Sequence, residues 1–138
     1  MDYVIIQKEG INMRFYKCDI CGNFVAMVED SGVNPFCCGQ KMTEVVANTQ
    51  EEVATEKHIP VIEVKDNKAI ITVGDVLHPM IKVHWIEWIL LVTTEGNKRK
   101  VLSPNDAPVA EFALLPNEKV LSAYAYCNLH GLWKRDNN

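Results

Sequence analysis

The stretch VHWIEWILLVTT, residues 83–94, indicates the fold most directly. It is a long run of β-branched, aromatic and other apolar residues, which favours a buried β-strand. The run breaks at EGN, residues 95–97, and a second run, KRKVLS, follows at residues 98–103. A short break that contains a glycine between two such runs predicts a β-hairpin.

The neighbouring segments continue this pattern. IPVIEV (59–64) and AIITVG (69–74) are separated by DNK, which suits a hairpin turn. VAEFALL (109–115) and KVLSAYAYC (119–127) follow, with a proline and an asparagine between them. Six or seven such strands, without a convincing helical period, predict an all-β fold, and we expect an immunoglobulin-like β-sandwich over residues 49–138.

The segment of residues 13–48 is different, because it is short, rich in turns and contains four of the five cysteines. About 35 residues cannot bury a sufficient hydrophobic core alone, so a bound metal is expected to supply the missing stability. We interpret residues 1–12 as an N-terminal extension, and the polar stretch ANTQEEVATE, residues 47–56, as a linker to the sandwich.

The cysteines of this segment have the spacing of a metal site. Cys18 and Cys21 form a C-x-x-C pair, and Cys37 and Cys38 are adjacent in the chain. Four thiolates suit a tetrahedral zinc or iron site, which adjacent cysteines would distort. The spacing leaves iron and zinc equally open. The alternatives are a structural zinc knuckle and a redox dithiol, although no βαβ pattern surrounds the C-x-x-C.

Composition excludes several classes of function. The net charge of −4 and the pI near 5.5 differ from the basic surface that is typical of nucleic-acid binding. No apolar run approaches the roughly 18 residues that a membrane span needs. The N-terminus does not resemble a secretory signal, so we expect a cytoplasmic protein, in which cysteines are metal ligands or reactive thiols rather than disulfides.

The histidines share the sandwich segment with the remaining cysteine, Cys127. There are four of them: His58, His78, His84 and His130. Each lies close to a proline, a glycine or the start of an expected strand, and a single histidine of this kind is more often a structural or surface residue. Together with Cys127, which has i, i+3 spacing to His130, they suit iron, copper or zinc. Five ligands leave one octahedral position open, which is typical of a catalytic metal.

Six motifs occur in order along the chain, and together they resemble one known family. The motifs are FYKC-x2-CG (15–22), CCG-x2-M (37–42), EKHIPVIE (56–63), VGDVLHPM (73–80), H-x-IEWI (84–89) and CNLHGLWK (127–134). They resemble the desulfoferrodoxins, the two-iron superoxide reductases, from about Phe15 to Lys134.

The resemblance implies two iron ions per chain. The ligands of an FeS4 centre, in a desulforedoxin-like module, would be Cys18, Cys21, Cys37 and Cys38. The equatorial ligands of the second iron would be His58, His78, His84 and His130. Cys127 would be the axial thiolate of that iron. Glu56 and Lys57 match the pair that the family has beside the open coordination position, and they are the expected catalytic residues.

The function implied by the resemblance is superoxide reductase, which reduces superoxide to hydrogen peroxide with one electron and produces no dioxygen. A small electron-donor protein such as rubredoxin would re-reduce the iron, and a homodimer is expected. The residues themselves leave two other interpretations open. One is a non-enzymatic electron carrier with coordinatively saturated iron, and the other is a purely structural zinc protein.

Overall fold

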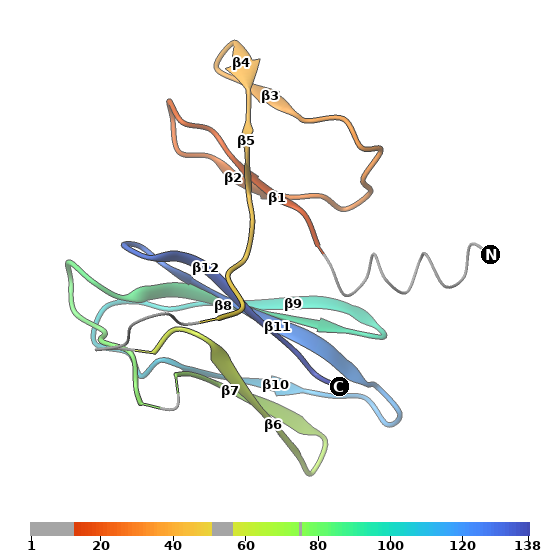
Figure 1. Ribbon diagram of the computed structural model, residues 1–138. Coiled ribbons are helices and arrows are strands. Elements are labelled where there is room, and N and C mark those ends of the chain that lie inside the picture. Colours follow the sequence, from red (N-terminus) through yellow and green to blue (C-terminus); the bar gives the residue numbers. More distant parts are fainter. Residues whose placement is uncertain (1–12, 51–56, 75) are drawn as a thin grey trace. The chain divides into compact units, whose positions relative to one another are not determined.

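The computed structural model describes residues 13–50, 57–74 and 76–138, which form twelve β-strands (Figure 1). Within this described part of the chain, no helix has the length and apolar character that a bilayer crossing requires. The chain divides into two compact units, of which the first ends at Val46 and the second begins at Ala47.

The first unit contains a three-stranded antiparallel sheet in the order β2-β1-β5 and a separate hairpin of β3 and β4. The bounds are β1 Phe15–Lys17, β2 Phe24–Ala26, β3 Phe36–Cys37, β4 Gln40–Lys41 and β5 Thr43–Val45. Its buried cluster is formed by Tyr16, Cys18 and Met42, against which Val25, Met27 and Cys37 pack. Because the strands are short and two cysteines belong to this small core, the core and the cysteine cluster stabilise each other.

The second unit has two antiparallel sheets, in the orders β10-β7-β6 and β12-β11-β8-β9, which are the two layers of strands in Figure 1. The bounds are β6 Pro60–Lys65, β7 Lys68–Val73, β8 Ile86–Thr93, β9 Gly96–Val101, β10 Val109–Ala113, β11 Val120–Cys127 and β12 Gly131–Asp136. Seven strands divided into three and four match the expected immunoglobulin-like sandwich. The prediction of an all-β fold is confirmed.

Both predicted hairpins are present. Asp66 and Asn67 connect β6 to β7 with φ angles of 54° and 60°, and left-handed conformations at both turn residues are typical of a type I′ turn. In the second hairpin the turn consists of residues 94–95, and β9 already begins at Gly96, because Gly96 pairs with Thr93. The second strand therefore begins earlier than the sequence predicted.

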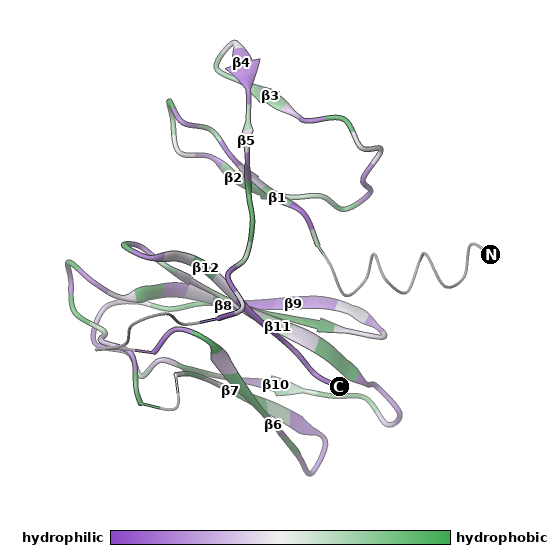
Figure 2. Ribbon diagram, in the orientation of Figure 1, coloured by the Kyte–Doolittle hydropathy of each residue, from purple (hydrophilic) through white to green (hydrophobic). Residues whose placement is uncertain are grey.

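The core lies between the two sheets. Alternate residues of β7, namely Ala69, Ile71 and Val73, are fully buried, as expected for a strand with one face in the core. The central strand β8 is buried at nearly every position, which agrees with its continuous apolar sequence. Figure 2 shows the contrast between hydrophobic β7 and the hydrophilic edge strand β9.

Strand register brings four strand ends together at one end of the sandwich. Ile86, the first residue of β8, pairs with Cys127, the last residue of β11. Pro60, the first residue of β6, pairs with Val73, the last residue of β7. All four histidines lie outside the named strands, near these strand ends. The sequence predicted a strand end or loop for each, but it included His84 in the run 83–94, whereas β8 begins two residues later, at Ile86.

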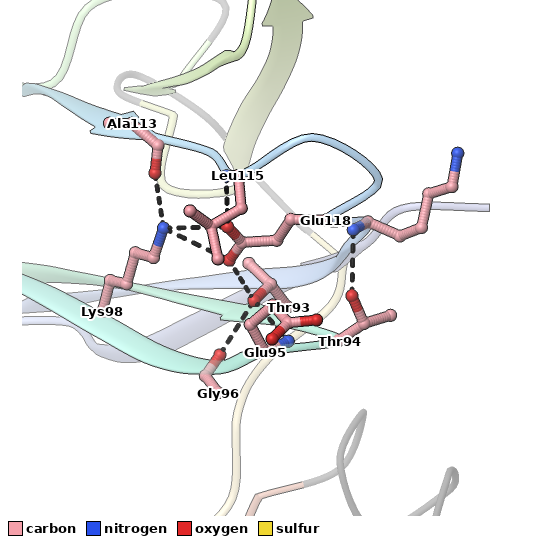
Figure 3. Close-up of polar contacts among 9 residues, drawn as sticks. Thr93, Thr94, Glu95, Gly96, Lys98, Ala113, Leu115 and Glu118 are labelled. Carbon is pink, nitrogen blue, oxygen red and sulfur yellow. Dashed lines mark hydrogen bonds and ion pairs between the residues drawn. The ribbon is translucent and has the colours of Figure 1, made fainter.

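The other end of β8 carries a buried carboxylate (Figure 3). Glu118 is 7% exposed and accepts hydrogen bonds from Thr93 Oγ1 at 2.5 Å, the Leu115 N–H at 2.8 Å and Lys98 Nζ at 3.2 Å. These donors, the Thr93 hydroxyl first, lower the pKa of Glu118. Lys98 also donates to the carbonyl of Ala113, so this network ties the β8–β9 hairpin to the connection between β10 and β11.

Candidate metal centres

The four cysteine sulfurs of the first unit lie within 4.8 Å of one another. The sulfurs of Cys21 and Cys37 are 3.6 Å apart, and those of Cys37 and Cys38 are 3.9 Å apart. These distances are far longer than a disulfide bond of about 2.0 Å. They match the edge of a tetrahedron around one metal, which is about 3.8 Å for metal–sulfur distances of about 2.3 Å. The cluster therefore fits a thiolate-bound iron.

Backbone turns deliver these sulfurs. After Cys18 the chain turns so that the Cys21 N–H lies 3.4 Å from the Cys18 sulfur, and Gly22 permits the turn with a φ of 84°. Cys38 has a φ of 54°, in the left-handed region. Neighbouring residues of an extended strand point to opposite faces, so this left-handed residue is what allows Cys37 and Cys38 to turn toward one centre.

The thiols of this cluster differ in acidity. The Cys21 N–H lowers the pKa of Cys18 to about 6, whereas hydrogen bonds with the Cys21 and Cys18 thiols raise the pKa of Cys38 to about 12. Cys18 therefore loses its proton most easily, whereas the hydrogen bonds within the cluster, and to a smaller extent the charge of Cys18, keep Cys38 protonated. A bound cation favours the thiolate form of all four cysteines, so the cluster suits a metal.

The second cluster lies at the strand ends of the sandwich. Its members are His58, His78, His84, Cys127 and His130, and their ligand atoms lie within 4.8 Å of one another. The structure thus brings together all five residues that the sequence grouped. Their individual roles as ligands stay a prediction, which this proximity supports.

The four imidazole rings form a closed cycle. Ring centroids are 4.8 Å apart for His58 and His78, 4.7 Å for His78 and His84, 5.1 Å for His84 and His130, and 4.8 Å for His130 and His58. His58 Nε2 and His130 Nδ1 are 3.1 Å apart. Neighbouring ligands at about 2.1 Å from a metal lie about 3.0 Å apart, so these two nitrogens have the separation of neighbouring ligands of one metal.

Hydrogen bonds and proximity indicate which ring nitrogen serves the centre. His78 Nδ1 lies 2.7 Å from the carbonyl oxygen of Pro79, which fixes the proton on Nδ1 and leaves the buried Nε2 for the cluster. His130 presents Nδ1 instead, because this atom lies 3.8 Å from the Cys127 sulfur and 3.1 Å from His58 Nε2.

Cys127 approaches the cycle from the core. Its side chain is fully buried and belongs to the main hydrophobic cluster, whereas His130 is exposed and His84 is half-buried. A thiolate in such a core is costly unless a cation balances its charge. Four imidazoles and one thiolate are a donor set that suits iron, so the residues fit the metal that the family resemblance implies.

Gly74 allows the segment before β6 to lie against the loop after β7. Its φ is 85°, and a Cβ atom there would lie 2.7 Å from the carbonyl oxygen of Lys57. The Gly74 N–H donates to the carbonyl of Ile59 at 3.2 Å, and the His78 N–H donates to that of Val73 at 3.3 Å. This close approach brings His58, which precedes β6, and His78, which follows β7, to the same centre.

The structure describes only one of the two predicted catalytic residues, Lys57 and Glu56. Lys57 is half-buried and precedes His58, and its role stays a prediction. Glu56 lies outside the described residues.

The sequence analysis missed Asn128. Its Oδ1 accepts from the Trp85 N–H at 2.9 Å, and its Nδ2 donates to the carbonyl of Val83 at 3.0 Å. Asn128 therefore fastens the loop that carries His84 to the turn that carries His130. It lies inside the CNLHG motif, but its partners are more than 40 residues away in the chain, so only the fold reveals the cross-link.

Comparisons with known proteins agree with this geometry. The family model described as desulfoferrodoxin matches residues 50–136, and the model of the desulfoferrodoxin N-terminal domain matches residues 11–45. A desulfoferrodoxin from Nitratidesulfovibrio vulgaris is 46% identical over 89% of this chain and 95% of its own length. A desulfoferrodoxin homolog from Archaeoglobus fulgidus is 45% identical over 88% of this chain and 95% of its own length.

Solved structures extend the likeness to three dimensions. The superoxide reductase from Treponema pallidum superposes with a TM-score of 0.75, at 35% identity, over 91% of this chain and 98% of its own. The superoxide reductase from Giardia intestinalis, described as a one-iron protein, covers 61% of this chain and 99% of its own, with a TM-score of 0.53 and 36% identity. From the matching family models, the close relatives and the two metal-ligand clusters, we conclude that the chain belongs to the desulfoferrodoxin family.

Proposed function

We propose that this protein is a superoxide reductase, which uses the histidine–cysteine cluster to convert superoxide, one electron and two protons into hydrogen peroxide. The observation that carries the proposal is the closed cycle of four imidazoles with a single thiol on its core side. Iron held there would supply the electron. Five protein donors leave one position of an octahedron for a small substrate, which an electron carrier with saturated iron does not need.

The surrounding side chains favour reduction of an anion. As a thiolate, Cys127 would donate electron density to the iron from the buried side, which would favour protonation and release of the peroxide product. Four imidazole donors add no charge, so ferrous iron held by them and one thiolate would keep a net positive charge that attracts an anionic substrate. The net charge of the chain, −4, opposes that attraction. Lys57 would therefore add local positive charge, and Glu56 would offer a carboxylate to the open position after the product leaves.

The cysteine cluster of the first unit would hold the second iron of the chain. Cys18, Cys37 and Met42 belong to one small core, so metal bound there stabilises the module. Each superoxide consumes one electron and releases no dioxygen, so the reaction suits a defence against oxidative stress that draws on an external donor. We propose that this donor is a small electron-transfer protein such as rubredoxin.

Localisation and assembly belong to the same proposal. The five cysteines group with other ligand residues into two candidate metal sites, and thiols kept for metal binding support a reducing compartment such as the cytoplasm. Large apolar side chains of the first unit are exposed, among them Val28 at 99% and Phe36 at 68%, which supports a homodimer that covers them.

The decisive experiment measures metal content, visible spectra and products together. Two irons per chain are expected, and the oxidised second centre should show a thiolate-to-iron absorption that shifts when azide binds. Superoxide generated by pulse radiolysis should yield hydrogen peroxide without dioxygen. Zinc in both sites would overturn the proposal, and iron that binds no azide would point to an electron carrier.

A further inference from the structure

Trp133, on strand β12, contacts two members of the histidine–cysteine cluster in two different ways. Its ring lies nearly parallel to the imidazole of His58, with centroids 4.6 Å apart and planes 14° from parallel. Its indole N–H donates to the carbonyl oxygen of His130 at 3.0 Å. One side chain thus touches the ring of one candidate iron ligand and the backbone of another.

Different described contacts hold His58 and the other histidines. His58 precedes β6, and its ring stacks on Trp133. By contrast, His84 takes part in a β-bridge with Ile81, and His78 is held by the bond from its own Nδ1 to Pro79. The His58 ring lies parallel to the Trp133 ring, whereas its contacts with the rings of His78 and His130 are edge-on.

Strand β12 holds the His58 segment at a second point. Trp133 and Arg135 are two residues apart, so their side chains leave the strand on the same face. Arg135 Nε donates to the carbonyl oxygen of Pro60 at 2.5 Å. On its own edge, β12 is tied to Asn48, whose N–H donates to Leu132 and whose carbonyl accepts from Lys134. Trp133 therefore belongs to a strand whose residues on either side of it, Leu132 and Lys134, are hydrogen-bonded to Asn48.

We propose that Trp133 is a positioning residue of the second centre, which fixes the ring plane of His58 through the stack and the turn of His130 through the indole N–H. The inference rests on the proposed binding of iron by this cluster. A parallel aromatic stack allows the imidazole to slide but resists its rotation, so Nε2 of His58 stays directed toward the cycle. Of the two contacts, the stack carries the larger effect, because the His130 turn is also held by the pairing of β11 with β12.

The test compares Trp133→Leu with Trp133→Phe in the full-length, iron-loaded protein. Outer contacts of metal ligands are typically worth about 10- to 100-fold in affinity. The leucine variant, which loses the stack and the N–H, should release ferrous iron from the second centre to a chelator about tenfold more readily than the wild type, on that scale. Its thiolate-to-iron absorption should also shift. Phenylalanine keeps a ring face for His58, so it should restore most of the affinity and the wild-type band.

Trp88 offers a matched control. It lies on β8 in the same sheet and stacks on Tyr126, with centroids 5.6 Å apart and planes 10° from parallel, so Trp88→Leu removes a stacked indole that does not face His58. Far-UV circular dichroism and the spectrum of the cysteine-bound iron check that each variant is folded.

Three outcomes would overturn the role of Trp133: unchanged iron release in Trp133→Leu, equal loss in Trp88→Leu, or no restoration by phenylalanine. Failure of the wild-type protein to hold iron in the second centre would instead contradict the proposed function itself.

Discussion

The sulfurs of the first cluster come from a short part of the chain, residues 18–38. The donors of the second cluster are spread over residues 58–130 and lie in loops at the ends of both sheets. The first cluster is made by two tight turns, and two of its cysteines are exposed. The second has its thiol in the core of the sandwich and depends on strand register, on Gly74 and on Asn128. Changes to the first should therefore stay local, whereas the second should respond to changes in loops that contain no ligand.

Replacement of the core-side thiol should have the largest effect. In Cys127→Ser an oxygen replaces the sulfur, so the thiolate-to-iron absorption should vanish. The rate of superoxide reduction should fall at least about 100-fold, since even outer contacts of ligands are worth up to that factor. Pulse radiolysis and visible spectroscopy measure both. The spectrum of the first centre should be unchanged, and an unaltered band from the second centre would remove Cys127 from the ligand set.

Gly74→Ala tests whether the second centre depends on the close approach of two segments of the chain, the one before β6 and the one after β7. The added Cβ would meet the backbone of Lys57, and the φ of 85° is unfavourable for alanine. Displacement of His58 should weaken iron binding by about tenfold, a typical effect of a misplaced ligand shell. The control is Gly96→Ala, where φ is also positive and a Cβ would meet nothing within 4 Å. If the two variants bind iron equally well, the close approach is unimportant.

Lys57→Ala tests attraction of the substrate. Focused charge raises association rates by about 10- to 1,000-fold, and one lysine should account for the lower end, so the second-order rate should fall roughly tenfold. The dependence on ionic strength should flatten, because salt screens the attraction that the substitution removes. Lys119→Ala makes the same change of charge at the other end of the sandwich. Equal rates and salt slopes for Lys57→Ala and the wild type would leave Lys57 an ordinary surface lysine.

Cys18→Ser should disrupt the first centre and change the rate at the second by less than about twofold, because the two clusters belong to separate compact units and share no ligand. The measured iron content should fall from two ions to one per chain, and the absorption band that shifts with azide should be retained. Loss of both irons would show that the two clusters are coupled. That result would contradict the expectation that changes to the first cluster stay local.

Glu118→Gln should leave the chemistry unchanged and lower only the thermal stability of the sandwich. The pKa of Glu118 is lowered in the folded state, so its carboxylate stabilises the fold above the ordinary glutamate pKa of about 4.3. That contribution is lost as the pH falls through the lowered folded-state pKa. The melting temperature of the variant should thus be a few degrees lower than that of the wild type at neutral pH, and the difference should shrink in acid.

The matched control for this change is Glu111→Gln. Glu111 forms an exposed ion pair with Lys68 at 3.4 Å, and exposed pairs contribute little. A melting difference for Glu118→Gln that does not vary with pH would contradict the role assigned to its charge.

The sequence alone determined a large part of this description. Local spacing predicted the Cys18–Cys21 loop, and two β-rich runs with turn residues between them predicted the β6–β7 hairpin, because both depend on residues that are neighbours in the chain. The neighbours of each histidine likewise indicated a strand end or a loop. The family resemblance supplied the grouping of His58 with the other ligands, which spacing could only suggest.

Only the tertiary structure decided how the second cluster is held. Gly74, Asn128 and Trp133 have neither the imidazole nor the thiol that marks the candidate ligands, so the sequence does not distinguish them. Their roles arise from contacts with residues far away in the chain, such as that between Trp133 and its stacking partner His58, which are 75 positions apart. Such contacts exist only after the two sheets pack and the strand register is set. Donor types can therefore be read from the chain, whereas the support that orients them follows from packing.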